Sequence, residues 1–251
     1  MFPKIKNINI LYKFKLKISY IKVLIKDIIF LVENKTEIKN ILNFIKNVLS
    51  PKKYNSELNN FFLQSTFSQS DWFTFKMPIF IEEINKNKIE IEKIKNILEI
   101  GSFEGRSTIF FLNYFIKSNI TCVDTWEGSY EQANIQMKNI EKNFDKNLEK
   151  YSGRIKKVKD NSDSFFEKNN QKYDFIFIDG YHHRDQVMKD AVNAVKHGSP
   201  GCFILFDDYT YRYGGHKKGE NPINAINKFL LENKNKIKII YIHSQILVKL
   251  I

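Results

Sequence analysis

Residues 98–108 read LEIGSFEGRST, and this stretch indicates the fold class because it joins an apolar strand to a helix through a glycine turn. Gly101 and Gly105 permit a tight turn and a close approach of the backbone, and the helix start beyond them offers free N–H groups. In open α/β sheets, ligands bind at the carboxyl ends of the strands where the strand order reverses. We therefore expect a ligand site directly after this first strand.

The chemistry of this turn narrows the choice of ligand. Its spacing lacks the third glycine of GxGxxG, and Glu99 and Glu104 make it acidic. A dinucleotide pyrophosphate needs the denser glycine pattern and carries the wrong charge, which disfavours an NAD-dependent oxidoreductase. An acidic loop suits a cofactor that bears an ammonium group and a sulfonium.

From residue 96 onward, apolar strands alternate with helical stretches, which predicts a Rossmann-like, doubly wound parallel sheet covered on both faces. The expected strands are 96–100, 120–124, 154–159, 173–179 and 202–207, and the expected helices are 105–117, 131–150, 184–196 and 221–233. Two β-rich runs at 237–242 and 245–251 predict an antiparallel hairpin that finishes the sheet.

The chain ahead of this α/β domain (96–251) divides into two parts. Residues 54–95 are a lead-in segment that we expect to cap the domain, with a helix from Pro78 to Lys86. Its aromatic cluster is Phe61, Phe62, Phe67, Trp72, Phe73 and Phe75.

Residues 1–53 form a basic N-terminal extension with two helical stripes, at 21–32 and 38–49. Asn34 and Glu37 have the spacing of a capping box, and Pro51 closes the second helix. The extension carries 12 Lys against three acids, a net charge of +9 out of +12 for the whole chain. We favour a helical hairpin that packs on the main domain or on a second subunit. The alternative is a cationic element that touches an anionic membrane or a partner.

Composition limits the class of partner. Only four of the 40 basic residues are arginine, and the chain after residue 53 is nearly neutral, which weakens a nucleic-acid interpretation. Cys122 and Cys202 lie inside apolar strands and are expected to be buried free thiols. Without a signal peptide or a long apolar run, we expect a cytoplasmic protein, with peripheral membrane contact as the alternative location.

The second strand ends in ITCVDTW, residues 120–126. Asp124 therefore lies 23 residues after Gly101, where a carboxylate can accept hydrogen bonds from both ribose hydroxyls.

Together, five segments resemble the class I S-adenosylmethionine-dependent methyltransferases: ILEIGSFEGRST (97–108), CVDTWEGS (122–129), KDNSDSFF (159–166), YDFIFIDGYHHRDQVMKD (173–190) and CFILFDDY (202–209). Within that class the chain is similar to the branch of small-molecule and sugar O-methyltransferases and cephalosporin-hydroxylase-like proteins. The resemblance covers residues 72–251 and departs from the branch at KHGSPG (196–201), where a Pro-Gly-Gly turn is usual and where we expect only the loop to change.

The resemblance implies a residue set for S-adenosylmethionine. The methionine part would contact Glu99, Gly101, Ser102 and Gly105, and Asp124 would bind the ribose. The adenine would contact Asp160, Asn161 and Ser162.

Acidic residues follow the fourth and fifth strands. Asp179 ends one, and Asp207 and Asp208 end the other, so three carboxylates should converge beside the cofactor. Oxygen ligands select a hard cation such as Mg²⁺, which would lower the pKa of an acceptor hydroxyl. The alternative is that Asp179 caps the following helix, while Asp207 or Asp208 forms a hydrogen bond to a loop.

His182 matches the DG-x-H pattern of the branch and, with Asp179, is the expected catalytic pair, His182 acting as the base. His183 is expected at the start of a helix, and the alternative for His182 is a loop-ordering hydrogen bond. Tyrosines expected near the acceptor are Tyr181, Tyr209, Tyr211 and Tyr213.

The predicted function is methyl transfer from S-adenosylmethionine to a hydroxyl of a small molecule or glycan. An RNA methyltransferase and a non-catalytic S-adenosylmethionine-binding module are the alternatives. Assembly into a homo-oligomer is left open.

Overall fold

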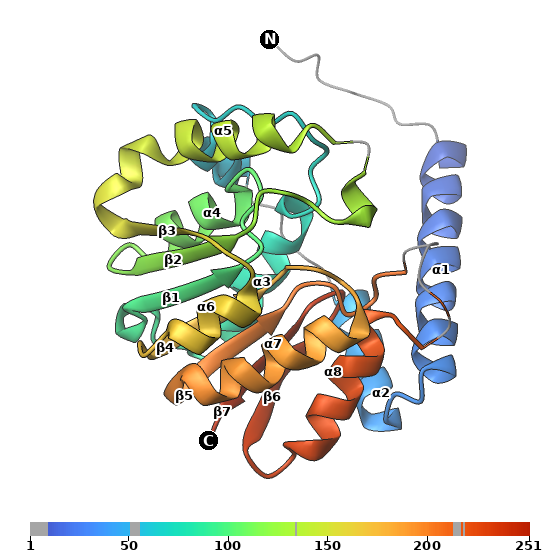
Figure 1. Ribbon diagram of the computed structural model, residues 1–251. Helices are drawn as coiled ribbons and strands as arrows, with labels where there is room; N and C mark the ends of the chain where they lie inside the picture. Colours follow the sequence, from blue (N-terminus) through green and yellow to red (C-terminus); the bar gives the residue numbers. More distant parts are fainter. Residues whose placement is uncertain (1–9, 51–55, 134, 213–216, 218) are drawn as a thin grey trace.

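The computed structural model describes residues 10–50, 56–133, 135–212, 217 and 219–251, and within them a seven-stranded sheet has the order β3-β2-β1-β4-β5-β7-β6 (Figure 1). The strands β1 to β5 run parallel to one another, whereas β7 runs antiparallel to both β5 and β6. The predicted Rossmann-like sheet with an antiparallel hairpin is confirmed. The strands are β1 (Asn96–Ile100), β2 (Asn119–Asp124), β3 (Ile155–Lys159), β4 (Tyr173–Ile178), β5 (Gly198–Phe206), β6 (Ile237–Ile242) and β7 (Ile246–Leu250).

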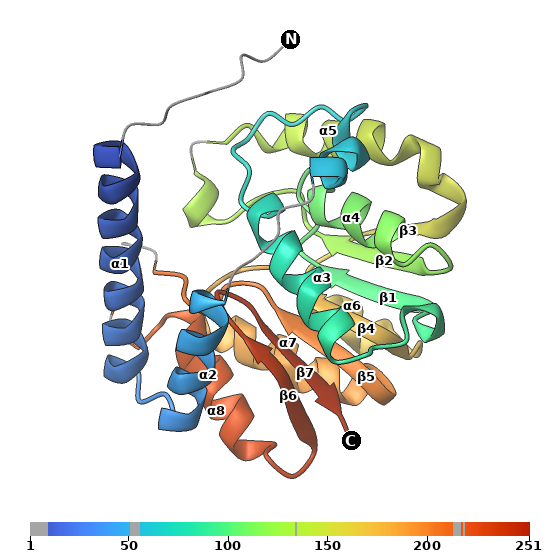
Figure 2. The same ribbon diagram turned by 180° about the vertical axis from the view of Figure 1, so that it is seen from behind.

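Helices cover both faces of the sheet, because successive strand residues point to opposite faces and most of them are apolar (Figures 1 and 2). The face that includes Ile97 and Phe175 packs against α3 (Met77–Lys86), α4 (Arg106–Tyr114) and α5 (Met137–Leu148). The face that includes Leu98 and Ile176 packs against α6 (Ser162–Lys168), α7 (Arg184–His197) and α8 (Pro222–Glu232). Short 3-10 helices are η1 (Ser56–Phe62), η2 (Thr74–Lys76), η3 (Ile91–Lys93), η4 (Tyr130–Gln132) and η5 (Glu149–Arg154).

The lead-in segment packs on α4 through aromatic rings. Phe73 and Phe80 both contact Phe110 and Phe111, with ring centroids 5.5–6.1 Å apart. The helix expected from Pro78 is confirmed as α3, with the proline in its first turn. This segment therefore brings η2 and its Lys76 to the sheet.

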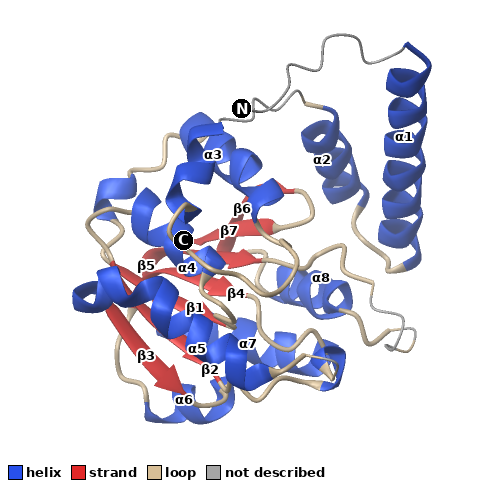
Figure 3. Cartoon of the chain, turned by 90° about the horizontal axis from the view of Figure 1, so that it is seen from above, coloured by secondary structure: helices blue, strands red, loops and turns tan. Residues whose placement is uncertain are grey.

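The N-terminal extension forms the predicted helical hairpin, α1 (Ile10–Glu33) and α2 (Ile38–Leu49), which stands at the edge of the molecule beside β6 (Figure 3). Asn47 Nδ2 donates a 2.9 Å hydrogen bond to the carbonyl of Ile242, and Thr36 Oγ1 lies 3.3 Å from Tyr209 Oη. None of the described helices is long and apolar enough to cross a membrane.

Two local expectations are wrong, and one short helix was missed. Asn34 does not form a capping box, because its Nδ2 donates to the carbonyl of Phe30 at the end of α1 and Glu37 makes no side-chain cap. Residues 196–201 form no loop, since β5 begins at Gly198 directly after α7. The short helix α6 was not predicted. Pro51 and Tyr213 lie outside the described residues, and the expected buried free thiols Cys122 and Cys202 are confirmed.

Gly101 is required where β1 meets β4. Its φ is +85°, and a Cβ at this position would lie 2.0 Å from the carbonyl oxygen of Asp179. The close approach follows from strand pairing, since the Asp179 amide donates to the carbonyl of Ile100 at 2.8 Å. Any side chain here would push apart the two strands between which the ligand site is expected.

We predict that Gly101→Ala lowers the free energy of unfolding by about 2–4 kcal/mol, because left-handed strain and overpacking each cost about 1–3 kcal/mol. Urea unfolding followed by circular dichroism measures the change. Gly153→Ala is the matched control: a Cβ at Gly153 would meet nothing within 4 Å, so its effect should stay within about 0.5 kcal/mol. Equal stability of the two variants would contradict the account of the β1–β4 junction.

Candidate active site

A cavity of about 910 Å³ opens at the carboxyl ends of the parallel strands. It lies at the junction of β1 and β4, where the strand order reverses. Of the residues predicted for the site, those that line the cavity are Gly101, Ser102, Asp124, Asp160, Asn161, Ser162, Asp179, His182, Asp207 and Asp208.

Glu99 and Gly105, the two other predicted cofactor residues, do not line the cavity. Glu99 is fully buried behind the turn, where its Oε2 accepts hydrogen bonds from Ser102 Oγ at 2.7 Å and from Thr108 Oγ1. Burial raises the pKa of Glu99. Gly105 precedes α4 with a φ of +80°, and a Cβ there would lie 2.9 Å from Leu148. Both residues therefore support the turn on the side away from the cavity, and neither lines the cavity.

Asp124 holds the two loops that border the cofactor end of the cavity. Its Oδ2 accepts hydrogen bonds from the amides of Ser102 and Phe103, both at 2.9 Å, and its Oδ1 accepts from the amide of Trp126 at 2.7 Å. Phe103 and Trp126 have φ values of +46° and +49°, which residues other than glycine rarely adopt. Asp124 thus keeps strained backbone in place while facing the cavity.

The predicted adenine-binding residues follow β3 at another wall of the cavity. Asn161 Oδ1 accepts from the amide of Ser164 at 2.9 Å and so caps α6. Asp160 pairs with Lys168 at 3.0 Å, and Ser162 Oγ accepts from Gln186 Nε2 at 3.0 Å. These side chains order the loop that lies along the cavity.

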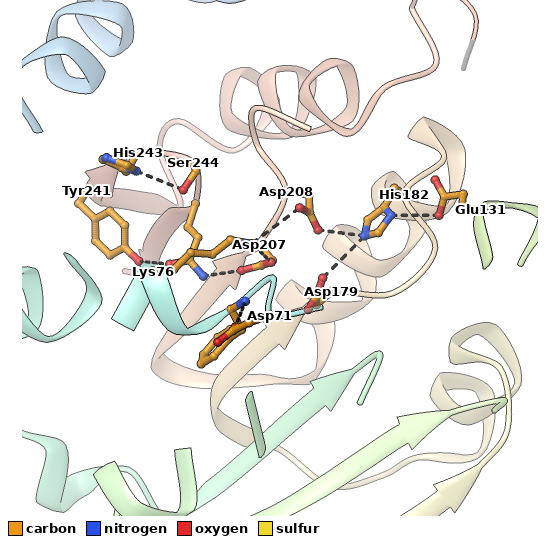
Figure 4. Close-up of polar contacts among 12 residues, drawn as sticks. Asp71, Lys76, Glu131, Asp179, His182, Asp207, Asp208, Tyr241, His243 and Ser244 are labelled. Atoms are coloured by element: carbon orange, nitrogen blue, oxygen red, sulfur yellow. Dashed lines mark hydrogen bonds and ion pairs between the residues drawn. The ribbon is translucent and has the colours of Figure 1, made fainter. Parts of the chain in front are cut away.

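Asp179, His182 and Asp208 also line the cavity, and they form a cluster whose ligand atoms lie within 4.8 Å of one another (Figure 4). His182 Nε2 lies 2.9 Å from Asp208 Oδ2 and 3.7 Å from Asp179 Oδ1, as an ion pair without the alignment of a hydrogen bond. On its other side, His182 Nδ1 lies 3.0 Å from Glu131 Oε2. Glu131 therefore keeps the proton on Nδ1 and leaves Nε2 facing the two aspartates.

The charges in this cluster shift its proton affinities. Burial would lower the pKa of His182, but Asp208, Asp179 and Glu131 together raise it well above its usual value. Burial and the neighbouring Asp207 raise the pKa of Asp179 well above its usual range. An imidazole that is already protonated cannot accept a proton, so His182 can act as a base only where another cation offsets these carboxylates.

Lys76 is the site residue that the sequence patterns did not reveal. It is 5% exposed, lines the cavity, and pairs through Nζ with Asp207 Oδ2; Nζ lies 3.8 Å from Asp208 Oδ1. Asp207 also accepts a hydrogen bond from Gln245 Nε2. The Asp207 carboxylate is thus directed to Lys76 and Gln245 and is not part of the three-residue cluster, contrary to the expected set of Asp179, Asp207 and Asp208.

Aromatic rings border the space beside the cluster. Trp72 and Phe75 are 53% and 60% exposed and line the cavity, as does Tyr211, whose ring centroid lies 4.5 Å from that of His182. Tyr181 lines it as well. Tyr209 does not, because it is fully buried and its hydroxyl donates to Asn227 Oδ1 at 2.7 Å.

This fold, with a glycine turn after β1 and acids ending β2, β4 and β5, is that of the class I S-adenosylmethionine-dependent methyltransferases. An O-methyltransferase from Bacillus cereus, solved with S-adenosylhomocysteine, is 16% identical with a TM-score of 0.51, covering 83% of this chain and 96% of its own. TomG from Streptomyces achromogenes, an O-methyltransferase involved in tomaymycin synthesis and solved with S-adenosylmethionine, is 12% identical with a TM-score of 0.51, covering 84% and 96%. MycE, from the mycinamycin biosynthetic pathway and solved with Mg and S-adenosylhomocysteine, is 14% identical with a TM-score of 0.51, covering 84% and 62%.

The sequence comparison agrees with the fold. Residues 98–209 match the family described as a methyltransferase domain. A search of curated proteins finds no match. Residues 98–209 thus match a methyltransferase domain, in agreement with the class that the sequence predicted.

We predict that Lys76→Met lowers the free energy of unfolding at pH 7 by about 3–5 kcal/mol, because it leaves Asp207 buried without its cation. The double variant Lys76→Met/Asp207→Asn should recover most of the loss, since neither charge then remains. Lys93→Met, which removes an exposed 2.8 Å pair with Glu90, is the control and should cost less than about 1 kcal/mol. A double variant as unstable as Lys76→Met would contradict the electrostatic explanation.

Proposed function

We propose that this protein transfers the methyl group of S-adenosylmethionine to a hydroxyl group of a small molecule, with sugars and phenols as the first acceptors to test. One observation carries the proposal: a single cavity is lined both by the Gly101 turn and by the Asp179, His182 and Asp208 cluster. A cofactor bound along the turn would have the cluster beside it. The expected cytoplasmic location and homo-oligomer stay predictions.

The cavity suits S-adenosylmethionine in its shape and polarity. The backbone turn at Gly101 lines it, and acidic side chains from the ends of β2 and β4 face it. Carboxylates favour a ligand that carries an ammonium and a sulfonium. When bound, this cofactor supplies an electrophilic methyl group. The Mg²⁺, S-adenosylhomocysteine and mycinamycin VI in the MycE complex support a small-molecule acceptor.

The cluster also fits a divalent cation. The buried His182 Nε2 has no hydrogen bond among the described residues and faces two carboxylates, while Glu131 holds Nδ1. A ligating histidine commonly donates its other N–H to a carboxylate in this way. Asp179, His182 and Asp208 would hold the ion, which would lower the pKa of the acceptor hydroxyl. Replacing one expected oxygen ligand by an imidazole also makes Mn²⁺ suitable beside Mg²⁺.

The roles of the chain's own side chains follow from their contacts. Because Nε2 of His182 cannot ligate a cation and accept a proton at once, we assign it to the cation and assign the acceptor's proton to Asp179. A carboxylate has two oxygens, so Asp179 can hold the cation through one and accept the proton through the other. Lys76 neutralises Asp207, and Trp72 and Phe75 offer apolar surface beside the acceptor.

We predict micromolar binding of S-adenosylhomocysteine by calorimetry, weakened by about 1.5–3 kcal/mol in Asp124→Ala, the range for hydrogen bonds to charged groups. Asp174→Ala is the matched control. Asp174 also accepts two backbone hydrogen bonds, from Lys95 and Asn96 at 3.0 Å, but at the other end of β4. It should keep full affinity. Tighter binding of NAD than of S-adenosylhomocysteine would reject the cofactor assignment.

We predict that Mn²⁺ binds near one equivalent per chain, detected by electron paramagnetic resonance without any acceptor present, and that Mg²⁺ displaces it. Asp208→Asn and His182→Ala should weaken Mn²⁺ binding by about 10- to 100-fold or more, while cofactor affinity changes little. His183→Ala is the control, because His183 caps α7 through the amide of Asp185.

Turnover then tests the role of the ion. Once an acceptor is found, chelation by EDTA should abolish methyl transfer, and added Mg²⁺ or Mn²⁺ should restore it. Full activity in EDTA, or unchanged Mn²⁺ binding in both cluster variants, would reject the cation and leave Asp179 as the base.

A further inference from the structure

The second helix of the N-terminal hairpin packs Phe44, together with Ile41, Ile45 and Val48, against the protein, but it leaves other apolar side chains exposed. The buried side chains of α2 include two asparagines, Asn40 and Asn47. Its exposed side chains include Ile38, Leu42 and Leu49, which are 76%, 61% and 60% exposed. A surface helix of a globular domain normally buries its apolar stripe and exposes its polar one. The outward stripe of α2 is therefore unexplained by packing within this chain.

A similar strip runs along α1. Leu24 and Leu31 pack into the body of the protein. Four other aliphatic residues follow the spacing i, i+4, i+8 and i+11, which places them on one side of the helix. They are Ile21, Ile25, Ile29 and Val32, each between 50% and 59% exposed. We call these four residues, with Ile38, Leu42 and Leu49, the outer face of the hairpin.

Lysines accompany the outer face. Lys22 and Lys26 follow Ile21 and Ile25 in sequence and are exposed along one edge of the α1 strip. Two of the three acidic side chains nearby are paired, Asp27 with Arg212 and Glu37 with Lys39 at 3.0 Å, whereas the third, Glu33, is exposed. Residues 1–53 have a net charge of +9.

We propose that the outer face of the hairpin docks on the surface of an anionic membrane. Aliphatic side chains bordered by lysines are the arrangement that binds at the level of anionic headgroups, where both burial and charge are favourable. A second copy of this chain would bring two strongly basic hairpins together, and the repulsion between like charges would oppose that contact. Charge complementarity therefore selects the membrane as the occupant.

The docking surface adjoins the acceptor end of the cavity. Arg212 donates to the carbonyl of Lys26 at 3.0 Å, and its guanidinium lies 5.0 Å from the ring of Phe30, so it fastens its loop to α1. The preceding residue in that loop, Tyr211, lines the cavity. When the protein docks on a membrane, the part of the cavity lined by Tyr211 would thus lie close to the hairpin and to the lipid surface.

Vesicle co-sedimentation of the full chain tests the proposal. The protein should bind vesicles of phosphatidylcholine mixed with phosphatidylglycerol, bind phosphatidylcholine alone much more weakly, and lose affinity as salt rises. The variant Ile21→Asn/Ile25→Asn/Leu42→Asn should bind at least about tenfold more weakly, because it removes apolar side chains from the contact. Lys22→Glu/Lys26→Glu should weaken binding to the anionic vesicles in particular.

The control is Leu63→Asn/Ile116→Asn/Leu231→Asn, whose parent residues are 76%, 62% and 58% exposed elsewhere on the protein. It should bind vesicles like the unchanged protein. S-adenosylhomocysteine binding by each variant shows that it is folded, and because the outer face holds no cavity residue, this readout is independent of docking.

Two results would overturn the proposal. The first is no binding to anionic vesicles by the unchanged, folded protein. The second is a dimer in light scattering that the Ile21/Ile25/Leu42 variant converts to a monomer, together with vesicle binding that this variant does not change. The second result would assign the outer face to another copy of the chain.

Discussion

Repulsion among three carboxylates at the ends of β4 and β5, one of them buried and two partly buried, is the constraint on which the rest of the site depends. In a medium of low polarity, like charges this close require a cation or a shared proton. Lys76 from the lead-in segment and Gln245 from the β6–β7 link both bind Asp207, and His182 contacts Asp208. The segments that flank the parallel sheet thus supply the groups that make its acidic edge stable.

Most of the fold could be predicted from the sequence because its signals are local. Each strand is a short apolar run, and each long helix repeats its apolar residues with a helical period. Errors occurred where a local pattern is ambiguous. The seven residues of α6 are too few to display a period, and the Asn34–Glu37 spacing fits equally a residue that ends one helix and a residue that precedes the next.

The site was predictable only to the extent that its residues follow strand ends. Asp179, His182 and Asp208 do, and the structure places them together. Adjacent residues of an extended chain point in opposite directions, so Asp207 faces Lys76 while Asp208 faces His182; the sequence does not say which is which. Lys76 lies 131 residues from its partner, a separation that no motif spacing reports.

The position of β7 between β5 and β6 governs the order in which this molecule can be assembled. As the chain leaves the ribosome, β6 appears before β7 but has no place in the sheet until β7 has paired with β5. The hairpin of residues 10–49 is separated from its partner by a longer stretch of chain, because Asn47 contacts Ile242, which is synthesised 195 residues later. The hairpin is therefore synthesised long before the strand that it contacts, and its apolar side chains stay exposed throughout that interval.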